Sequence, residues 1–297
     1  MGISGHPTAP LLRFVVPLTV HPSTAPRIKL RDGRYLAYKE HGVSKQVAKY
    51  NIIFVHGFGS SRHDALIATQ FSPELVEDLG VYIVSFDRPG YGESDPDPKR
   101  TVKSLALDIE ELADQLGLGS KFYVVGYSMG GQVIWSCLQY IPHRLAGATL
   151  HAPVINYWWP GFPANLSTDA YYKQPPGDQW ALRVAHHERD GSGRENNKPQ
   201  GKQQGEFESV HRDLMIGFGN WEFDPIEIKN PFPNNEGSVH LWPGWMKIGL
   251  SQLNFKRYIV GKLPWIHYHE LPGSGHLFPY KDGMSEAVLK AMLTGGK

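Results

Sequence analysis

Four short apolar runs in the first half of the chain have the composition of buried β-strands. They span residues 50–56, 81–86, 122–125 and 145–151. Continuous apolar runs of this length are typical of strands that are covered on both faces. Stretches with helical periodicity lie between them, at residues 72–79, 102–116 and 130–140. This alternation predicts an α/β protein with a mostly parallel sheet flanked by helices on both sides.

The ends of the folded region carry further elements. Asp32 and Gly33 separate two strand-like segments, 27–31 and 34–40, and therefore predict an opening antiparallel hairpin. Two more strands are predicted at 238–242 and 266–271, with a helical segment between them and a final helix at 284–293. These elements divide the chain into four predicted regions. They are a disordered tail or leader over 1–23, a first core part over 24–153, an insertion over 154–233, and a second core part over 234–297. Within the insertion, the polar stretch 186–205 is predicted to be a flexible loop.

Charge and cysteine content narrow the classes of function. Thirty Lys and Arg residues oppose 29 Asp and Glu residues, so the chain lacks the basic field of a nucleic-acid or anionic-membrane binder. The single cysteine, Cys137, excludes an internal disulfide and a multi-cysteine metal site. No apolar run reaches the roughly 18 residues that a membrane span requires. We therefore expect no integral membrane segment, a small-molecule partner and a cytoplasmic location.

The N-terminal segment leaves one alternative for localisation. Residues 1–31 contain no Asp or Glu but several Ser, Thr, Arg and Pro residues, which is compatible with an organelle transit segment. The prolines disrupt the amphipathic character of such leaders, so a disordered tail is favoured. Organelle import remains open.

The sequence Gly126-Tyr127-Ser128-Met129-Gly130 follows an apolar strand directly and precedes a helix. This is the context in which the G-x-S-x-G pattern forms a nucleophile elbow. A serine on such a strained turn exposes its Oγ, and the small flanking residues leave room for the turn. Ser128 is therefore the candidate nucleophile, and the alternative is a glycine-rich turn with an incidental serine.

Two further motifs have the positions that catalysis by Ser128 would need. His56-Gly57-Phe58-Gly59 closes the strand at 50–56, which predicts that the backbone N–H groups of Phe58 and Met129 form an oxyanion hole. The alternative is a simple turn at the end of a strand. His276, in Gly273-Ser274-Gly275-His276, follows the last predicted strand and is the candidate general base. The alternative for His276 is an ordinary surface histidine.

With these motifs the chain resembles the α/β-hydrolase superfamily, and within it a group of plant α/β-hydrolase-like proteins. Three stretches carry the resemblance: Phe86-Asp87-Arg88-Pro89-Gly90-Tyr91-Gly92-Glu93-Ser94, the Ser128 motif with Gly131, and Gly273-Ser274-Gly275-His276-Leu277-Phe278. The resemblance implies an α/β-hydrolase fold, a cap formed by residues 154–233, and hydrolysis of an ester, thioester or lactone without a metal or organic cofactor. A serine at the nucleophile position argues against the epoxide hydrolases and haloalkane dehalogenases, which use aspartate.

The chain departs from this family at the acid of the catalytic triad. The family resemblance places an aspartate after the penultimate strand, in a stretch such as Gly-Asp-Glu-Asp-Arg-Leu-Val-Pro, but Lys247 stands there. The alternative acid position, after the strand at 145–151, has no carboxylate either. Glu236 and Glu270 are the nearest acids in sequence, and each is also explained as an ordinary surface charge. The triad acid is therefore unassigned.

The anomalous loop has a possible genetic origin. Met-Lys-Ile-Gly at 246–249 can be encoded so that the frame one base earlier reads Asp-Glu-Asp-Arg, and the same shift through residue 253 can continue Leu-Val-Pro-Val. We hypothesise that 245–253 is a local frame shift of an ordinary acid loop, the alternative being chance degeneracy of the code.

These observations favour a serine carboxylic-ester hydrolase with reduced activity. The alternative is a small-molecule binding protein on the same fold that turns over slowly or not at all. Tyr157, Trp158 and Trp159 suggest an apolar or aromatic ligand, and packing inside the cap explains them equally well.

Overall fold

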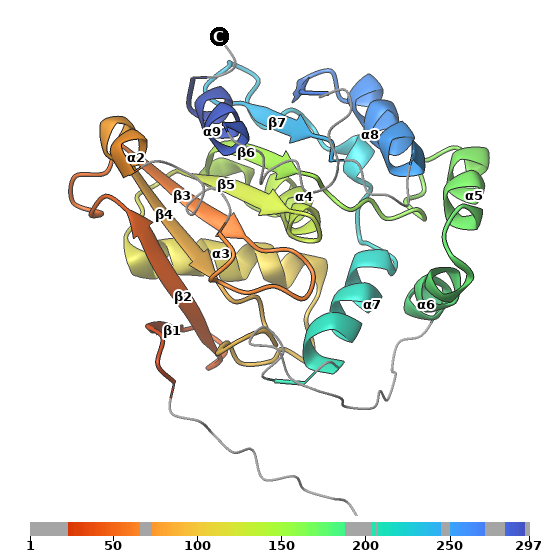
Figure 1. Ribbon diagram of the computed structural model, residues 1–297, viewed down its shortest axis with the longest axis horizontal. Helices are drawn as coiled ribbons and strands as arrows, with labels where there is room; N and C mark the ends of the chain where they lie inside the picture. Colours follow the sequence, from red (N-terminus) through yellow and green to blue (C-terminus); the bar gives the residue numbers. More distant parts are fainter. Residues whose placement is uncertain are drawn as a thin grey trace, which may run out of the picture.

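A mixed β-sheet forms the centre of the molecule (Figure 1). The structure is a computed structural model that describes residues 23–65, 73–187, 204–205, 207–244, 250–270 and 283–294. Within these residues the sheet has eight strands in the order β1-β2-β4-β3-β5-β6-β7-β8. The strands are β1 (Arg27–Lys29), β2 (Tyr35–Gly42), β3 (Tyr50–Val55), β4 (Val81–Phe86), β5 (Phe122–Tyr127), β6 (Leu145–His151), β7 (Val239–Trp242) and β8 (Ile266–Tyr268). β1, β2 and β4 pair antiparallel, and the strands from β4 to β8 are parallel.

Helices cover both faces of the sheet. The helices of the core are α2 (Pro73–Leu79), α3 (Val102–Leu116), α4 (Gly130–Tyr140), α8 (Leu250–Lys262) and α9 (Met284–Thr294). Successive side chains of a strand point to opposite faces, and β3 shows this directly. Ile53 packs with α3 and α4, whereas Ile52 packs with α2 and α9. The predicted α/β class, with a mostly parallel sheet and helices on both faces, is confirmed.

The sequence determines where α3 begins and ends. The Thr101 hydroxyl accepts a hydrogen bond from the Ser104 N–H at 3.0 Å, and the Ser104 hydroxyl accepts one from the Thr101 N–H at 3.0 Å. This reciprocal pair is a capping box, which satisfies N–H groups that have no partner inside the helix. Gly117 ends the helix with φ 65°, a conformation that glycine adopts without strain.

Most predicted elements coincide with the observed ones. The strands at 81–86 and 145–151 and the helices at 102–116 and 130–140 have the predicted bounds. The opening hairpin is antiparallel, and Gly33 at its turn has φ 91°. The strand predicted at 122–125 continues to Tyr127, whereas the one predicted at 266–271 pairs only as far as Tyr268.

The segment between β6 and β7 contains most of the remaining structure. Its helices are α5 (Ala164–Tyr172), α6 (Pro176–His187) and α7 (Arg212–Phe218), together with the π-helical turn η3 (Phe207–His211) and the 3-10 turn η4 (Pro225–Glu227). A further 3-10 turn, η1 (Pro142–Arg144), precedes β6. In Figure 1 the three helices lie together, to the right of the sheet. None of the described helices is long and apolar enough to cross a membrane.

The prediction of a flexible loop over 186–205 is wrong for its first two residues, which are helical. α6 continues through His187, and the His186 ring stacks on Trp158 with ring centroids 4.5 Å apart. The His186 Nδ1–H also donates to the Phe218 carbonyl oxygen at 2.9 Å, so tertiary contacts extend the helix into this polar stretch. Residues 188–203 of the predicted loop, like residues 1–22 of the predicted tail, lie outside the described residues.

The aromatic residues at the start of the inserted segment pack as core. Tyr157 and Trp159 are buried. The Trp159 ring lies 6.1 Å from Trp135 of α4 and 5.0 Å from Trp221, and Tyr157 lies 5.6 Å from Phe255 of α8. These rings therefore fasten the inserted segment to the core helices, which is the packing role that the sequence left open.

Candidate active site at the end of strand β5

Ser128 occupies a strained turn between β5 and α4. Its φ of 55° lies in the left-handed region, which is uncommon for any residue other than glycine. The Ser128 N–H donates to the His151 carbonyl oxygen at 2.9 Å, and the Ser128 carbonyl oxygen accepts from the N–H groups of Gly131 at 3.0 Å and Val154 at 3.1 Å. The neighbouring strand and helix therefore hold the backbone in this conformation.

Two glycines make the turn possible because the backbones around it are in contact. A Cβ atom on Gly126 would lie 2.3 Å from the Gly130 carbonyl oxygen, and one on Gly130 would lie 2.3 Å from the Val55 carbonyl oxygen. Contacts this short are repulsive, so no larger residue fits at either position without movement of the backbone. The G-x-S-x-G pattern is thus the steric consequence of bringing β5, α4 and the end of β3 together.

The loop that follows β3 reaches Ser128. A Cβ atom on Gly57 would lie 3.1 Å from the Ser128 Cβ, so the two backbones are close neighbours. Within the described ranges, the N–H groups of Phe58 and Met129 donate to no other group, and the Ser128 hydroxyl has no hydrogen-bond partner. The backbone of this loop is therefore a direct neighbour of the Ser128 turn, and the oxyanion-hole role of Phe58 and Met129 stays a prediction.

His56 holds this loop in place. Its Nε2 accepts a hydrogen bond from the Arg88 N–H at 3.1 Å, so Nδ1 carries the proton and donates to the Gly57 carbonyl oxygen at 2.8 Å. Burial lowers the pKa of His56 to about 3, and the positive charge of Arg88 acts in the same direction. The imidazole is therefore neutral at ordinary pH and both of its nitrogens are occupied, which makes it a structural residue.

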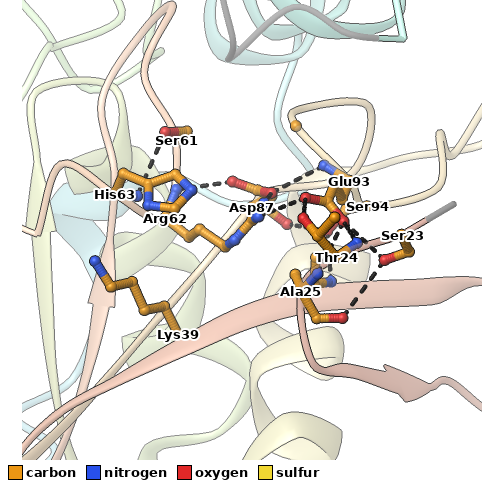
Figure 2. A network of polar contacts seen from close by, with 12 residues as sticks. Ser23, Thr24, Ala25, Lys39, Ser61, Arg62, His63, Asp87, Glu93 and Ser94 are labelled. Atoms are coloured by element: carbon orange, nitrogen blue, oxygen red, sulfur yellow. Dashed lines mark hydrogen bonds and ion pairs between the residues drawn. The ribbon is translucent and has the colours of Figure 1, made fainter. Parts of the chain in front are cut away.

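Asp87 holds the other end of the same loop, as Figure 2 shows. Its carboxylate accepts hydrogen bonds from the Arg62 N–H at 2.7 Å, from the Arg62 guanidinium and from the Glu93 N–H at 3.0 Å. Glu93 in turn accepts from Arg62 at 2.7 Å and from the Ser23 hydroxyl and the N–H groups of Thr24 and Ala25, at 2.7–3.0 Å. The sequence alone does not reveal this role of Asp87. The available signal was the charged pair Asp87-Arg88 directly after a mostly apolar strand.

The structure does not place the candidate base or the missing acid. His276 and Lys247 lie outside the described residues, as does most of the 245–253 stretch, although α8 begins at Leu250 within it. Glu236 precedes β7, at the opposite edge of the sheet from Ser128, and accepts from the Asn234 N–H. Glu270 follows β8 and is ion-paired with Arg257 of α8. The assignments of His276 and of the acid stay predictions.

The described residues contain one buried lysine near that loop. Lys256 of α8 is 2% exposed, and its Nζ donates to the Gly244 carbonyl oxygen at 3.3 Å. Burial lowers the pKa of Lys256 to about 7. In the described part of the chain, no group of three or more His, Cys, Asp or Glu side chains is placed to bind a metal ion.

Comparison with known proteins supports the fold class predicted from the sequence, the α/β-hydrolase fold. Residues 50–189 match a family model described as alpha/beta hydrolase fold. Two curated bacterial proteins match part of the chain. One is the dihydrolipoyllysine-residue acetyltransferase component of the acetoin cleaving system of Cupriavidus necator, 29% identical over 41% of this chain and 30% of its own length. The other is a proposed 2-succinyl-6-hydroxy-2,4-cyclohexadiene-1-carboxylate synthase of Bacillus subtilis, 30% identical over 42% of this chain and 43% of its own length. The match thus spans less than half the length of these relatives.

Solved structures resemble nearly the whole chain. A thermophilic esterase from Thermogutta terrifontis is 20% identical with a TM-score of 0.59, covering 93% of this chain and 100% of its own. The enol-lactonase from Burkholderia xenovorans LB400 is 16% identical with a TM-score of 0.58, covering 91% and 100%. At these identities the likeness concerns the fold. The chain has the α/β-hydrolase fold.

The close approach at Gly130 predicts a large effect of one added methyl group. We expect Gly130→Ala to lower the free energy of unfolding by about 1–3 kcal/mol or more, because its Cβ must displace the end of β3. Urea unfolding of the purified protein measures this difference. Gly177→Ala is the matched control, since a Cβ there meets no atom within 4 Å and the residue lies in a helix. Equal stability of the two variants would contradict the packing described here.

The Glu93 hydrogen bonds predict acid sensitivity. Partial burial opposes ionisation of Glu93, but its hydrogen bonds lower its pKa from 4.5 to about 2. The ionised form therefore stabilises the folded state above pH about 4.5, and this contribution is lost as the pH falls toward 2. Melting temperatures between pH 6 and pH 3 should fall more steeply for the wild type than for Glu93→Gln. Glu77→Gln, at an exposed position of α2, should follow the wild type.

Proposed function

We propose that the protein is a serine hydrolase that cleaves a carboxylic ester, thioester or lactone of an apolar small molecule. One observation carries the proposal: Ser128 stands on a left-handed turn against the backbone of Gly57, and the N–H groups of the adjacent residues Phe58 and Met129 have no other partner among the described residues. A hydroxyl nucleophile and two convergent amide donors are the groups that acyl transfer requires.

In the proposed mechanism His276 removes the proton from the Ser128 hydroxyl as its oxygen attacks the substrate carbonyl carbon. The carbonyl oxygen becomes an oxyanion that accepts hydrogen bonds from Phe58 and Met129. Protonated His276 then donates to the departing alcohol, thiol or lactone oxygen, which leaves an acyl ester on Ser128. Water, deprotonated by the same imidazole, cleaves that ester and restores the serine. The role of His276 rests on its position in the sequence after β8.

The comparisons support an acyl-transfer chemistry of this general kind. The structural neighbours include an esterase and an enol-lactonase, and the relative from Cupriavidus necator is named as an acetyltransferase component. We propose water as the acyl acceptor because the neighbours that span the chain are hydrolytic by name. The fold itself hosts many reactions, so the substrate class remains part of the proposal.

The second candidate function is ligand binding with slow or no turnover. It is favoured by one feature of the sequence, the lack of a carboxylate at either usual position of the triad acid, with Lys247 in one of them. Without the acid, the base lacks the partner that fixes its tautomer and stabilises its cation. We therefore propose an activity below that of a complete triad.

The first test identifies the nucleophile. A fluorophosphonate probe should label the wild type and should not label Ser128→Ala, because the probe reacts with a serine that is activated as a nucleophile and flanked by oxyanion donors. Mass spectrometry of the labelled protein locates the adduct. Ser44→Ala, which removes an exposed serine after β2, should label like the wild type. Labelling that persists in Ser128→Ala would remove the assignment.

The second test concerns the acid loop. Replacing residues 246–253 with Asp-Glu-Asp-Arg-Leu-Val-Pro-Val should raise kcat on an activated ester by roughly 10³–10⁴-fold, the factor that loss of the triad acid costs in a serine protease. The same replacement with Asn instead of the second Asp is the matched control and should stay near the native rate. If the native chain already equals the replaced one, another carboxylate serves as the acid, and Glu236 and Glu270 are the first to substitute.

A further inference from the structure

A buried ion cluster joins the inserted segment to the core. Asp213 of α7 accepts hydrogen bonds from the Arg88 guanidinium, from Arg100 and from the Tyr91 hydroxyl, each at 2.7 Å. The Arg88 Nη2 also lies 2.6 Å from the second carboxylate oxygen as an ion pair. All four residues are at most 5% exposed. Burial opposes ionisation of Asp213, but the charges of Arg88 and Arg100 lower its pKa, so the carboxylate stays ionised. The cluster brings together residues 125 positions apart in the chain.

Arg88 also contacts the loop beside Ser128. Its Nη2 donates to the Gly57 carbonyl oxygen at 2.9 Å, and the Nδ1–H of His56 donates to the same oxygen at 2.8 Å. The C=O and N–H groups of a trans peptide lie in one plane and point in opposite directions. Two donors that fix the Gly57 carbonyl therefore also fix the direction of the Phe58 N–H.

The other end of α7 packs against the Ser128 turn. A Cβ atom on Gly217 would lie 2.3 Å from the Gln132 Oε1 and 2.7 Å from the Met129 Cε. The Gln132 Nε2 donates to the Gly217 carbonyl oxygen at 3.1 Å. α7 therefore contacts Met129 directly. It is also linked to the Gly57–Phe58 peptide, because Arg88 binds both Asp213 and the Gly57 carbonyl oxygen. Phe58 and Met129 are the two residues whose N–H groups form the proposed oxyanion hole.

Stability alone does not account for this cluster. A buried charge group gains little over well-packed apolar side chains, because the loss of hydration offsets most of the attraction. The cluster instead fixes an orientation: the Arg88 Nη1–H donates to Asp213, and the Nη2–H of the same planar guanidinium donates to the Gly57 carbonyl oxygen. The position of α7 therefore influences the orientation of the Gly57–Phe58 peptide.

We propose that Arg88 and Asp213 are positioning residues that hold the Phe58 N–H toward Ser128, so that the oxyanion hole depends on how α7 is seated. The proposal rests on the proposed function, which gives the Phe58 N–H its role. When α7 shifts, the Gly57–Phe58 peptide loses a donor that orients it and the oxyanion loses a hydrogen bond. The inserted segment therefore regulates the chemical step as well as covering the core.

The test compares Arg88→Lys with Arg100→Lys in the full chain. Both variants keep a buried positive charge beside Asp213, but only the first removes a hydrogen bond to Gly57. We expect Arg88→Lys to lower kcat and the rate of fluorophosphonate labelling by about 10²–10³-fold, the effect of losing one oxyanion donor, with KM changed less than about threefold. Arg100→Lys should stay within about threefold in rate, even where it lowers the melting temperature as much. Equal rate losses in both variants would overturn the proposal.

Asp213→Asn provides a second variant that keeps the shape of the carboxylate. We expect it to lower the labelling rate by about tenfold, since Arg88 keeps one acceptor but loses its charged partner. A labelling rate equal to the wild type in a folded Asp213→Asn variant would count against the proposal.

A measurement independent of activity separates this proposal from the proposed function. In the ¹⁵N-labelled protein, the amide signal of Phe58 should shift in Arg88→Lys and stay in place in Arg100→Lys. If the wild type is not labelled by fluorophosphonate, the proposed function fails, and the amide signal still decides the positioning role. An unmoved Phe58 signal in folded Arg88→Lys would overturn it.

Discussion

The contact of three backbones behind Ser128 is the constraint on which the rest of the structure depends. β5 enters the turn, α4 leaves it, and the end of β3 lies against Gly130 with no space for a Cβ atom. Because the turn is left-handed at Ser128, it holds together only where neighbouring elements supply its hydrogen bonds. The parallel order β3-β5-β6 supplies them, since the carboxyl ends of adjacent parallel strands meet at one edge of the sheet. The strained backbone at Ser128 is thus a consequence of how the sheet is built.

Charged side chains at the carboxyl edge of the sheet fix the irregular loop that follows β3. A loop has no repeating backbone pattern of its own to satisfy its polar groups, so side chains must provide partners. Asp87 and Arg88, adjacent in sequence, hold opposite ends of the loop after β3, at Arg62 and at Gly57. Neutral His56 completes the hold on Gly57. The burial of these charges is tolerated because nearly every polar atom in the group has a partner within hydrogen-bond distance.

The inserted segment is attached to the core by two kinds of contact. Its aromatic residues pack on α4 and α8, and the buried carboxylate of Asp213 joins the charge group at the edge of the sheet. The segment therefore has both an apolar and an ionic attachment to the core. The apolar one supplies most of the stabilisation, since apolar burial is the dominant favourable contribution to folding, and the ionic one fixes orientation.

The sequence by itself determined the elements and the position of the strained turn at Ser128. Apolar runs, capping residues and glycines act over a few residues, so the bounds of α3 and α4, the hairpin at Gly33 and the candidate nucleophile Ser128 could all be predicted locally. Tertiary structure alone decided the partners: His56 became a structural residue through Arg88, α6 extended through His186 by contacts with Trp158 and Phe218, and Asp213 met Arg88 across 125 residues. The physical reason is that a polar side chain has many possible partners in a sequence, and only the packing of distant helices against the sheet selects one.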